Sequence, residues 1–161
     1  MFDDRQHSES GSSTCRWGRK KRGPQSLGRS RGGFSTKIHA AVDALGNPVR
    51  LLLSPGQSSD IGQAKALIEG FDFDFLLGDK GYDSKDLEAK VSEKQAVTCI
   101  PSRKNCIIQR DYDQHLYKDR NLVERFFNLI KHFRRVATRY EKTDQNYLAM
   151  AHFASVVILL R

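Results

Sequence analysis

The sequence predicts one α/β domain preceded by a basic N-terminal arm. The chain has 161 residues, the size of one ordinary domain, and 39% of them are hydrophobic, enough to form a core. Short apolar segments alternate with segments of helical spacing through the middle of the sequence, which favours parallel strand pairing with helices packed on a sheet. We therefore divide the chain into a flexible arm, residues 1–35, and a folded domain, residues 36–161.

The arm is defined by its charge and its lack of hydrophobic period. The segment GRKKRGPQSLGRSRGG is rich in residues that break regular structure, and from Arg16 to Lys37 there are eight Lys or Arg and no acid. With a net charge of +8, this distribution indicates a polyanionic partner, most commonly nucleic acid. A basic protein without such a partner is the alternative that composition leaves open.

A hairpin is predicted to open the domain. The segment STKIHAAVDALGNPVRLLLSPG contains two apolar stretches joined by a turn at Ala44–Pro48. Between Lys37 and Asp43 polar and apolar residues alternate, which is the period of a half-buried strand. His39 and Asp43 share the polar side and could form a catalytic pair, but a half-exposed polar face explains them as well.

The remaining elements follow in order. SSDIGQAKALIEGF has helical spacing, with Ser59 or Asp60 as N-cap. DFDFLLGDKGYD is then predicted as a short strand that ends in a Gly-rich turn. SKDLEAKVSEK is predicted to be helical, and AVTCIPS to be another buried strand. Two longer helices are predicted over Tyr117–Ala137 and Asp144–Leu160.

Cysteine use and hydropathy indicate a cytoplasmic protein without a membrane segment. Cys15, Cys99 and Cys106 have no metal-ligand spacing, and so sparse a set is typical of a reducing compartment. The first residues have no signal-peptide pattern, and the apolar run Tyr147–Leu160 is short for a bilayer.

One face of the predicted helix over Tyr117–Ala137 gathers basic residues around a single acid. At about 100° per residue, Tyr117, Arg120, Lys131 and Arg135 lie within an arc of roughly 60° around Glu124. The opposite face is apolar and must pack on a core. Its members are Leu122, Phe126, Leu129, Ile130, Phe133 and Val136.

This basic face permits two interpretations. The simpler is an i,i+4 ion pair between Arg120 and Glu124, worth a few tenths of a kcal/mol. The second is a phosphodiester-binding surface, on which cations and a phenol contact phosphates while the carboxylate holds a divalent metal. The spacing alone does not decide between them.

The spacing Tyr-x2-Arg-x3-Glu-x6-Lys, met by Tyr117, Arg120, Glu124 and Lys131, resembles the signature of bacterial insertion-sequence transposases of the DDE type. GRSRGGFSTKIHAAVDALGNP and LLGDKGYDS are similar to two further blocks of that group. The resemblance implies a ribonuclease-H-like fold, a mixed sheet flanked by helices. It also implies DNA transposition by metal-dependent strand cleavage and strand transfer, with two Mg²⁺ or Mn²⁺ ions.

The resemblance also implies roles for individual residues. Asp79 and Glu124 match the second and third carboxylates of the catalytic triad and would hold the metal, although Asp79 alone could be a simple turn residue. Phosphates would be contacted by Tyr117, Arg120, Lys131 and Arg135, with Lys80 and Tyr82 as weaker candidates. The arm would follow the DNA backbone through Arg16, Arg19, Lys20, Lys21, Arg22, Arg29 and Arg31.

The first aspartate of the triad has no counterpart in the sequence. In the family it lies on the first strand, whereas Asp3 and Asp4 follow too few residues for a strand. We therefore expect that strand upstream of Met1, with this chain as a truncated or frame-shifted copy or the second of two overlapping reading frames. Without one carboxylate of the triad, two-metal binding and activity of the isolated chain should be weakened.

Three hypotheses follow. The chain is a DNA-cleaving enzyme, acting as a homodimer or with a complementing transposase polypeptide, or it is a catalytically inactive DNA-binding remnant. The third, an unrelated basic α/β protein, requires the signature to be coincidence.

Overall fold

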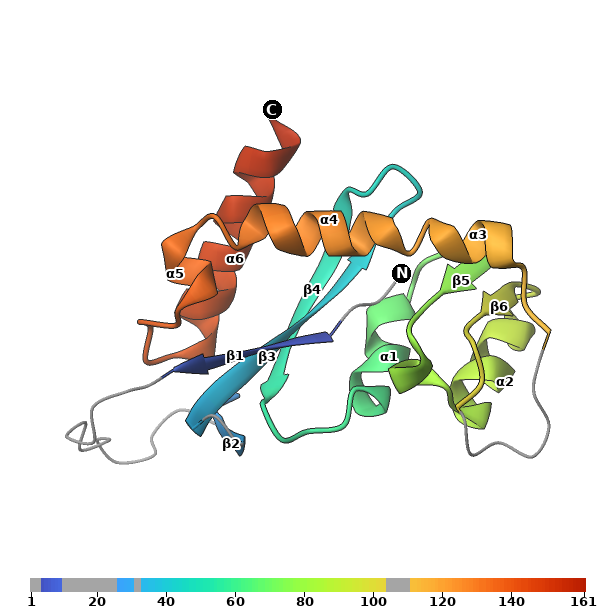
Figure 1. Cartoon of the computed structure of the whole chain (residues 1–161), viewed down its shortest axis with the longest axis horizontal. Helices are drawn as coiled ribbons and strands as arrows, with labels where there is room; N and C mark the ends of the chain where they lie inside the picture. Colours follow the sequence, from blue (N-terminus) through green and yellow to red (C-terminus); the bar gives the residue numbers. More distant parts are fainter. Residues whose placement is uncertain (1–3, 10–25, 31–32, 104–110) are drawn as a thin grey trace.

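The structure, a computed structural model, describes residues 4–9, 26–30, 33–103 and 111–161. It is a mixed α/β fold with an antiparallel sheet at its centre, a small parallel sheet at one end, and helices on both sides (Figure 1). The α/β class predicted from the alternation of segments is confirmed. None of the described helices is long and apolar enough to cross a membrane.

The antiparallel sheet is organised around one long strand. β3 (Gly33–Val42) pairs with β4 (Pro48–Pro55) on one edge, with Ile38 opposite Leu53, and with β1 (Asp4–Glu9) through Asp4 opposite His39. A short β2 (Gly28–Ser30) also pairs with β3. The predicted hairpin is therefore present, and β3 is the strand on which the sheet depends.

Asp43 has a structural role in the hairpin turn. Its carboxylate accepts hydrogen bonds from the backbone N–H groups of Leu45 and Asn47, each at 2.9 Å, and from the Asn47 side chain at 3.0 Å. Burial alone would raise the pKa of Asp43, but these bonds outweigh it and lower the pKa. Gly46 supplies the left-handed residue of the turn with φ +87°.

The arm expected over residues 1–35 contains two strands. Asp4–Glu9 and Gly28–Ser30 form β1 and β2 by pairing with β3, although the sequence has no alternation there that would predict strands. β1 begins at Asp4 and continues after it, so this strand does not end in an aspartate as the first strand of the family would. The basic residues of 10–25 and Arg31 lie outside the described residues.

Helices bury both faces of β3. Ile38, Ala40 and Val42 belong to a core shared with the C-terminal helices, whereas Ala41 belongs to a second core under the first helix. His39 was expected on a half-exposed face, but its exposed fraction is 0%. The second face is covered, so its polar side chains are paired rather than solvated.

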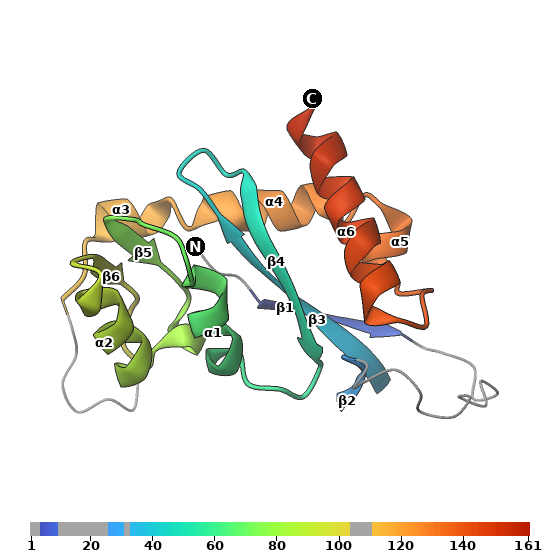
Figure 2. The ribbon, with the colours of Figure 1, turned by 180° about the vertical axis from the view of Figure 1, so that it is seen from behind.

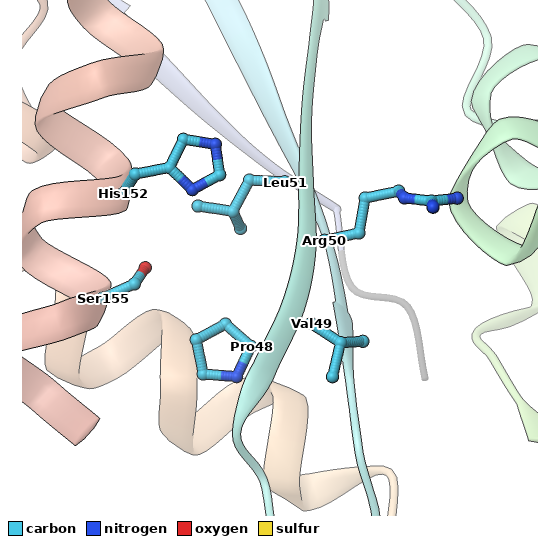
Figure 3. Close-up of a pocket in the computed structure, with 6 residues that line it drawn as sticks. All are labelled: Pro48, Val49, Arg50, Leu51, His152 and Ser155. Atoms are coloured by element: carbon cyan, nitrogen blue, oxygen red, sulfur yellow. The ribbon is translucent and has the colours of Figure 1, made fainter. Parts of the chain in front are cut away.

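The neighbouring strand β4 has the same two-sided environment. Figure 3 shows Pro48 and Leu51 directed toward His152 and Ser155, while Arg50 points to the opposite side. There the Arg50 guanidinium donates to the carbonyls of the first helix's last turn, at 2.6 Å to the oxygen of Ala66.

The parallel sheet lies at the end of the molecule away from the C-terminal helix (Figures 1 and 2). β5 (Phe75–Leu77) pairs with β6 (Val97–Cys99), Leu76 opposite Thr98, which confirms the predicted parallel pairing. Three further elements surround these strands: α1 (Ile61–Ile68), the 3-10 helix η1 (Lys80–Tyr82) and α2 (Lys85–Glu93). In the described part of the chain this sheet shares no ladder with the antiparallel one.

The long helix predicted over Tyr117–Ala137 is three helices. They are α3 (Gln114–Lys118), α4 (Asn121–Ile130) and α5 (Arg134–Ala137). The chain stays nearly helical through Arg120, so α3 and α4 follow end to end (Figure 1), but Phe133 is extended with ψ 102°. The second predicted helix is α6 (Asp144–Leu159), capped by Thr143.

The break before α5 changes the predicted apolar and basic faces. Val123, Phe126, Phe127 and Ile130 are the buried residues of α4, whereas Leu129, expected to be buried, is 43% exposed. The prediction was wrong for Leu129 because the buried face of α4 includes Val123 and Phe127, and at 100° per residue Leu129 lies about 110° from the centre of that face.

Arg139, which follows α5, is buried. Its guanidinium pairs with Asp144 at 2.9 Å and donates to the Thr36 hydroxyl at 2.6 Å. The Asp144 carboxylate also accepts from the backbone N–H of Ser26. These bonds join the start of α6 to β3.

Phe126→Ala should lower the free energy of unfolding by about 3–5 kcal/mol, because Phe126 is 2% exposed in the main core. Leu129→Ala on the same helix should cost less than about 1 kcal/mol. Urea denaturation of both variants measures the difference. Equal losses would contradict the orientation of α4.

The stability should fall as the pH falls from about 6.5 to 4, because of His39. Burial is the main reason that its pKa is lowered to about 4, so the unfolded chain takes up a proton at a pH where the folded one does not. The loss attributable to this histidine at pH 4 is about 3 kcal/mol.

Unfolding free energies measured between pH 7 and 4 should therefore depend less on pH in His39→Gln than in the wild type. The exposed His115 provides a control, and His115→Gln should retain the wild-type dependence. Identical pH profiles for all three proteins would exclude a neutral, buried His39.

Candidate active site

The turn after β5 presents Asp79 at the edge of the parallel sheet. Asp79 precedes η1, and its carboxylate accepts a hydrogen bond from the N–H of Lys80 at 2.8 Å. Its own carbonyl accepts from Tyr82 N–H at 2.9 Å. The apolar strand β5 is thus followed by a glycine-containing turn, in which the Asp79 carboxylate is partly exposed.

Two contacts from distant segments hold this turn. The Arg103 guanidinium donates to the carbonyls of Lys80 and Gly81, and its backbone N–H donates to the Asp83 carboxylate at 2.9 Å. The ring of Tyr82 is 1% exposed, and its hydroxyl lies 3.3 Å from Nδ1 of His39. The turn carrying Asp79 is thereby joined to β3. Tyr82, a weaker phosphate candidate from the sequence, is buried, whereas Lys80 is exposed.

Glu124 lies in the first turn of α4 and forms a close ion pair. Its carboxylate is 2.6 Å from the guanidinium of Arg120, the residue at the α3–α4 junction. The exposed fractions of these side chains are 23% for Arg120 and 36% for Glu124. Both groups are therefore reachable from solvent.

An aromatic pair completes the junction. The Arg120 guanidinium lies 5.6 Å from the centre of the Tyr117 ring, and the ring of Tyr112 packs edge-on against Tyr117 at 5.2 Å. Tyr112 has no counterpart in the signature; its only sequence signal is a position five residues before Tyr117.

The charge of Asp79 contributes to the electrostatics of this junction. Burial is the main reason that the pKa of Tyr117 is raised, and the Asp79 charge raises it further while Arg120 opposes the change. Burial alone would lower the pKa of Arg120, but Tyr117, Glu124 and Asp79 together raise it above its ordinary value. Asp79 and Glu124, 45 positions apart in the sequence, thus act on the same guanidinium.

The other predicted phosphate contacts are more distant. Lys131 ends α4, about 10 Å along the helix from Glu124 at 1.5 Å per residue. Arg135 lies on α5, beyond the extended Phe133, and its guanidinium is 3.9 Å from Glu141. Arg135 is therefore not on the face of α4 that carries Glu124. Arg29 is exposed on β2.

The donor set suits one divalent cation. Mg²⁺ takes one or two carboxylates and completes its shell with water and phosphate oxygens. Asp79 and Glu124 are both carboxylates that solvent can reach. Among the described residues, no group of three or more His, Cys, Asp and Glu side chains could hold a metal ion. Asp43 is committed to its turn, and Asp60 pairs with Lys37 at 2.8 Å.

Comparison with known proteins identifies the family. A family model described as a transposase DDE domain matches residues 4–159. A Brucella ovis protein, whose name describes it as a transposase for insertion sequence element IS6501, is 36% identical over 133 residues, which cover 80% of this chain and 100% of that protein.

A second relative, from Burkholderia cepacia, is longer. Its name describes it as a transposase for insertion sequence element IS402, and it is 30% identical over 139 residues, 79% of this chain but 63% of that protein. No solved structure matches the chain. The extent of the family match and the identity to two insertion-sequence proteins lead to one conclusion: the chain belongs to the DDE-domain transposases of bacterial insertion sequences.

Proposed function

We propose that this chain provides the strand-cleavage and strand-transfer site of a DNA transposase, with Asp79 and Glu124 as its metal-holding carboxylates. The observation that carries the proposal is that the charges of Asp79 and Glu124, 45 positions apart in the sequence, both act on the Arg120 guanidinium, which is paired with Glu124 at 2.6 Å.

Asp79 and Glu124 would hold Mg²⁺ or Mn²⁺. Such an ion, when bound, activates an attacking water or 3′-hydroxyl and stabilises the leaving oxygen of the phosphodiester. Arg103 donates hydrogen bonds to this turn, and Tyr82 contacts His39 of β3. These contacts keep the Asp79 carboxylate at the sheet edge. The packing of α4 through its buried residues fixes the orientation of Glu124, which stays partly exposed.

Arg120 and Tyr117 would contact the phosphates. In the absence of DNA, the Arg120 guanidinium is paired with Glu124. If the Glu124 carboxylate held a metal ion instead, the guanidinium would be available to a phosphate oxygen. The raised pKa of Tyr117 keeps its hydroxyl protonated at neutral pH, so it can donate a hydrogen bond to the phosphate. Lys131, about 10 Å away, would contact a phosphate further along the same strand.

The partners are DNA, namely the ends of the insertion sequence and its target, and either a second copy of the chain or a complementing transposase polypeptide. The basic residues of the N-terminal segment would follow the DNA backbone without reading sequence. This activity places the protein in the bacterial cytoplasm, at the nucleoid.

A catalytically inactive DNA-binding remnant is the second candidate function. It is favoured by one observation: among the described residues, no third carboxylate joins Asp79 and Glu124 in a metal-holding group. A remnant would bind DNA through the same basic surface and interfere with an active relative.

The purified chain should nick supercoiled plasmid in Mn²⁺, and Asp79→Asn or Glu124→Gln should reduce nicking by more than the roughly 10–100-fold typical of residues that only support a ligand. All three proteins should bind DNA, which filter binding checks. If none of them nicks while all bind, the remnant function is correct. Nicking by either variant at the wild-type rate would exclude that carboxylate as a metal ligand.

Arg120→Gln should weaken DNA binding at every sequence tested and reduce the salt slope by about 1, because one phosphate contact is removed. Arg125→Gln is the matched control, since Arg125 is an exposed arginine of the same helix about 100° away from Glu124. Titrations at several salt concentrations measure both slopes. Equal effects of the two changes would indicate that the charge of the helix matters but the position of Arg120 does not.

A further inference from the structure

The C-terminal helix α6 carries apolar residues on two opposite faces. Its inner face packs on the main core through residues spaced i, i+4, i+7 and i+11, namely Tyr147, Ala151, Ala154 and Ile158. The same spacing starts again two residues later, which at 100° per residue is about 200° around the helix. We call this second set the outer stripe; its members are Ala149, Phe153, Val156 and Leu160.

The outer stripe is exposed to solvent. The exposed fractions are 62% for Phe153, 51% for Val156 and 82% for Leu160, and 49% for the neighbouring Leu159. Figures 1 and 2 both show the last turns of α6 extending beyond α4. No residue from 145 to 160 is an Asp, Glu, Lys or Arg. A helix that is apolar on all sides is normally buried on all sides, so we expect a partner to cover the outer stripe.

The spacing of the outer stripe is self-complementary. Steps of four, three and four residues are those of the a and d positions along the seam of paired helices. When two copies of α6 run antiparallel about a two-fold axis between Phe153 and Val156, Phe153 of one copy faces Val156 of the other. Ala149 then faces Leu160. Each large side chain meets a smaller one, the alternation that lets facing layers interlock.

Size and charge also favour a second copy as the partner. The exposed parts of the outer stripe and of Leu159 come to roughly 1,000 Å² in two copies, the lower end of specific interfaces. The chain has a net charge of +8, so two copies repel one another in most orientations. On a face without charged side chains, they can meet without bringing like charges together.

We propose that the outer stripe of α6 is the interface through which two copies of this chain associate, as an antiparallel helix pair. The proposal deepens the proposed function and rests on it in one respect, namely that the partner polypeptide is a second copy of the chain. No residue of the outer stripe belongs to the candidate active site, so the pair forms without using Asp79, Arg120 or Glu124.

Sedimentation of the full chain, without DNA or metal, measures this association. An interface of this area predicts a dimer with a micromolar dissociation constant. Leu160→Glu should raise that constant at least tenfold, because the carboxylate would be buried without a partner. Leu45→Glu is the matched control, since Leu45 is also 82% exposed but lies in the turn between β3 and β4. It should change the constant less than twofold.

Cysteine cross-linking tests the orientation of the pair. In an antiparallel pair, residues 149 and 160 of different copies face each other, whereas the two copies of residue 149 lie about 16 Å apart along the axis. A mixture of Ala149→Cys and Leu160→Cys should therefore form a disulfide-linked dimer on oxidation, and neither variant alone should. Both variants also carry Cys15→Ser and Cys106→Ser, and the remaining Cys99 is buried.

A chain that stays monomeric at about 100 μM would overturn the proposal and leave the outer stripe to a different polypeptide or to a lipid surface. Equal effects of Leu160→Glu and Leu45→Glu would also overturn it, as would cross-linking of Ala149→Cys with itself, which indicates a parallel pair. Nicking is measured separately. A monomer that nicks contradicts the interface alone, and a dimer that does not nick contradicts the catalytic proposal alone.

Discussion

The burial of β3 on both faces is the constraint from which the rest of the structure follows. Ile38, Ala40 and Val42 pack toward α4 and α6, and the residues between them face α1 and η1. Lys37 and His39 are enclosed on that second side and must be paired there, Lys37 with Asp60 and His39 with Tyr82 and Ser54. A single strand thus determines two cores and a row of polar contacts.

This constraint also sets the position of the candidate site. Glu124 is fixed because the buried face of α4 packs on one side of β3, and Asp79 is fixed because Tyr82, three residues later, contacts His39 on the other side. The two carboxylates are therefore held from opposite sides of one strand. Both of their charges act on the Arg120 guanidinium. The groups proposed to bind DNA and hold metal are thus organised by packing rather than by local sequence.

Much of this was predictable where a local pattern determines structure. Alternation and the turn residues at Ala44–Pro48 predict the hairpin, and an apolar run before glycine predicts that Asp79 ends a strand. Other features have no local signal. No Gly or Pro lies between Gln114 and Ala137, so the breaks that separate α3, α4 and α5 are not visible in the sequence. They result from packing, and they carry Arg135 away from Glu124. The burial of His39 could not be predicted without knowing which elements cover the second face of β3.

The position of Asp79 and Glu124 around one cation is the central claim, and iron-mediated backbone cleavage tests it directly. Fe²⁺ replaces Mg²⁺ in carboxylate sites and, with ascorbate and peroxide, cuts the chain beside its ligands. The account predicts cuts next to Asp79 and next to Glu124, suppressed by excess Mg²⁺, and both lost in Asp79→Asn and in Glu124→Gln. Cuts at one residue that persist when the other is replaced would contradict a shared metal site.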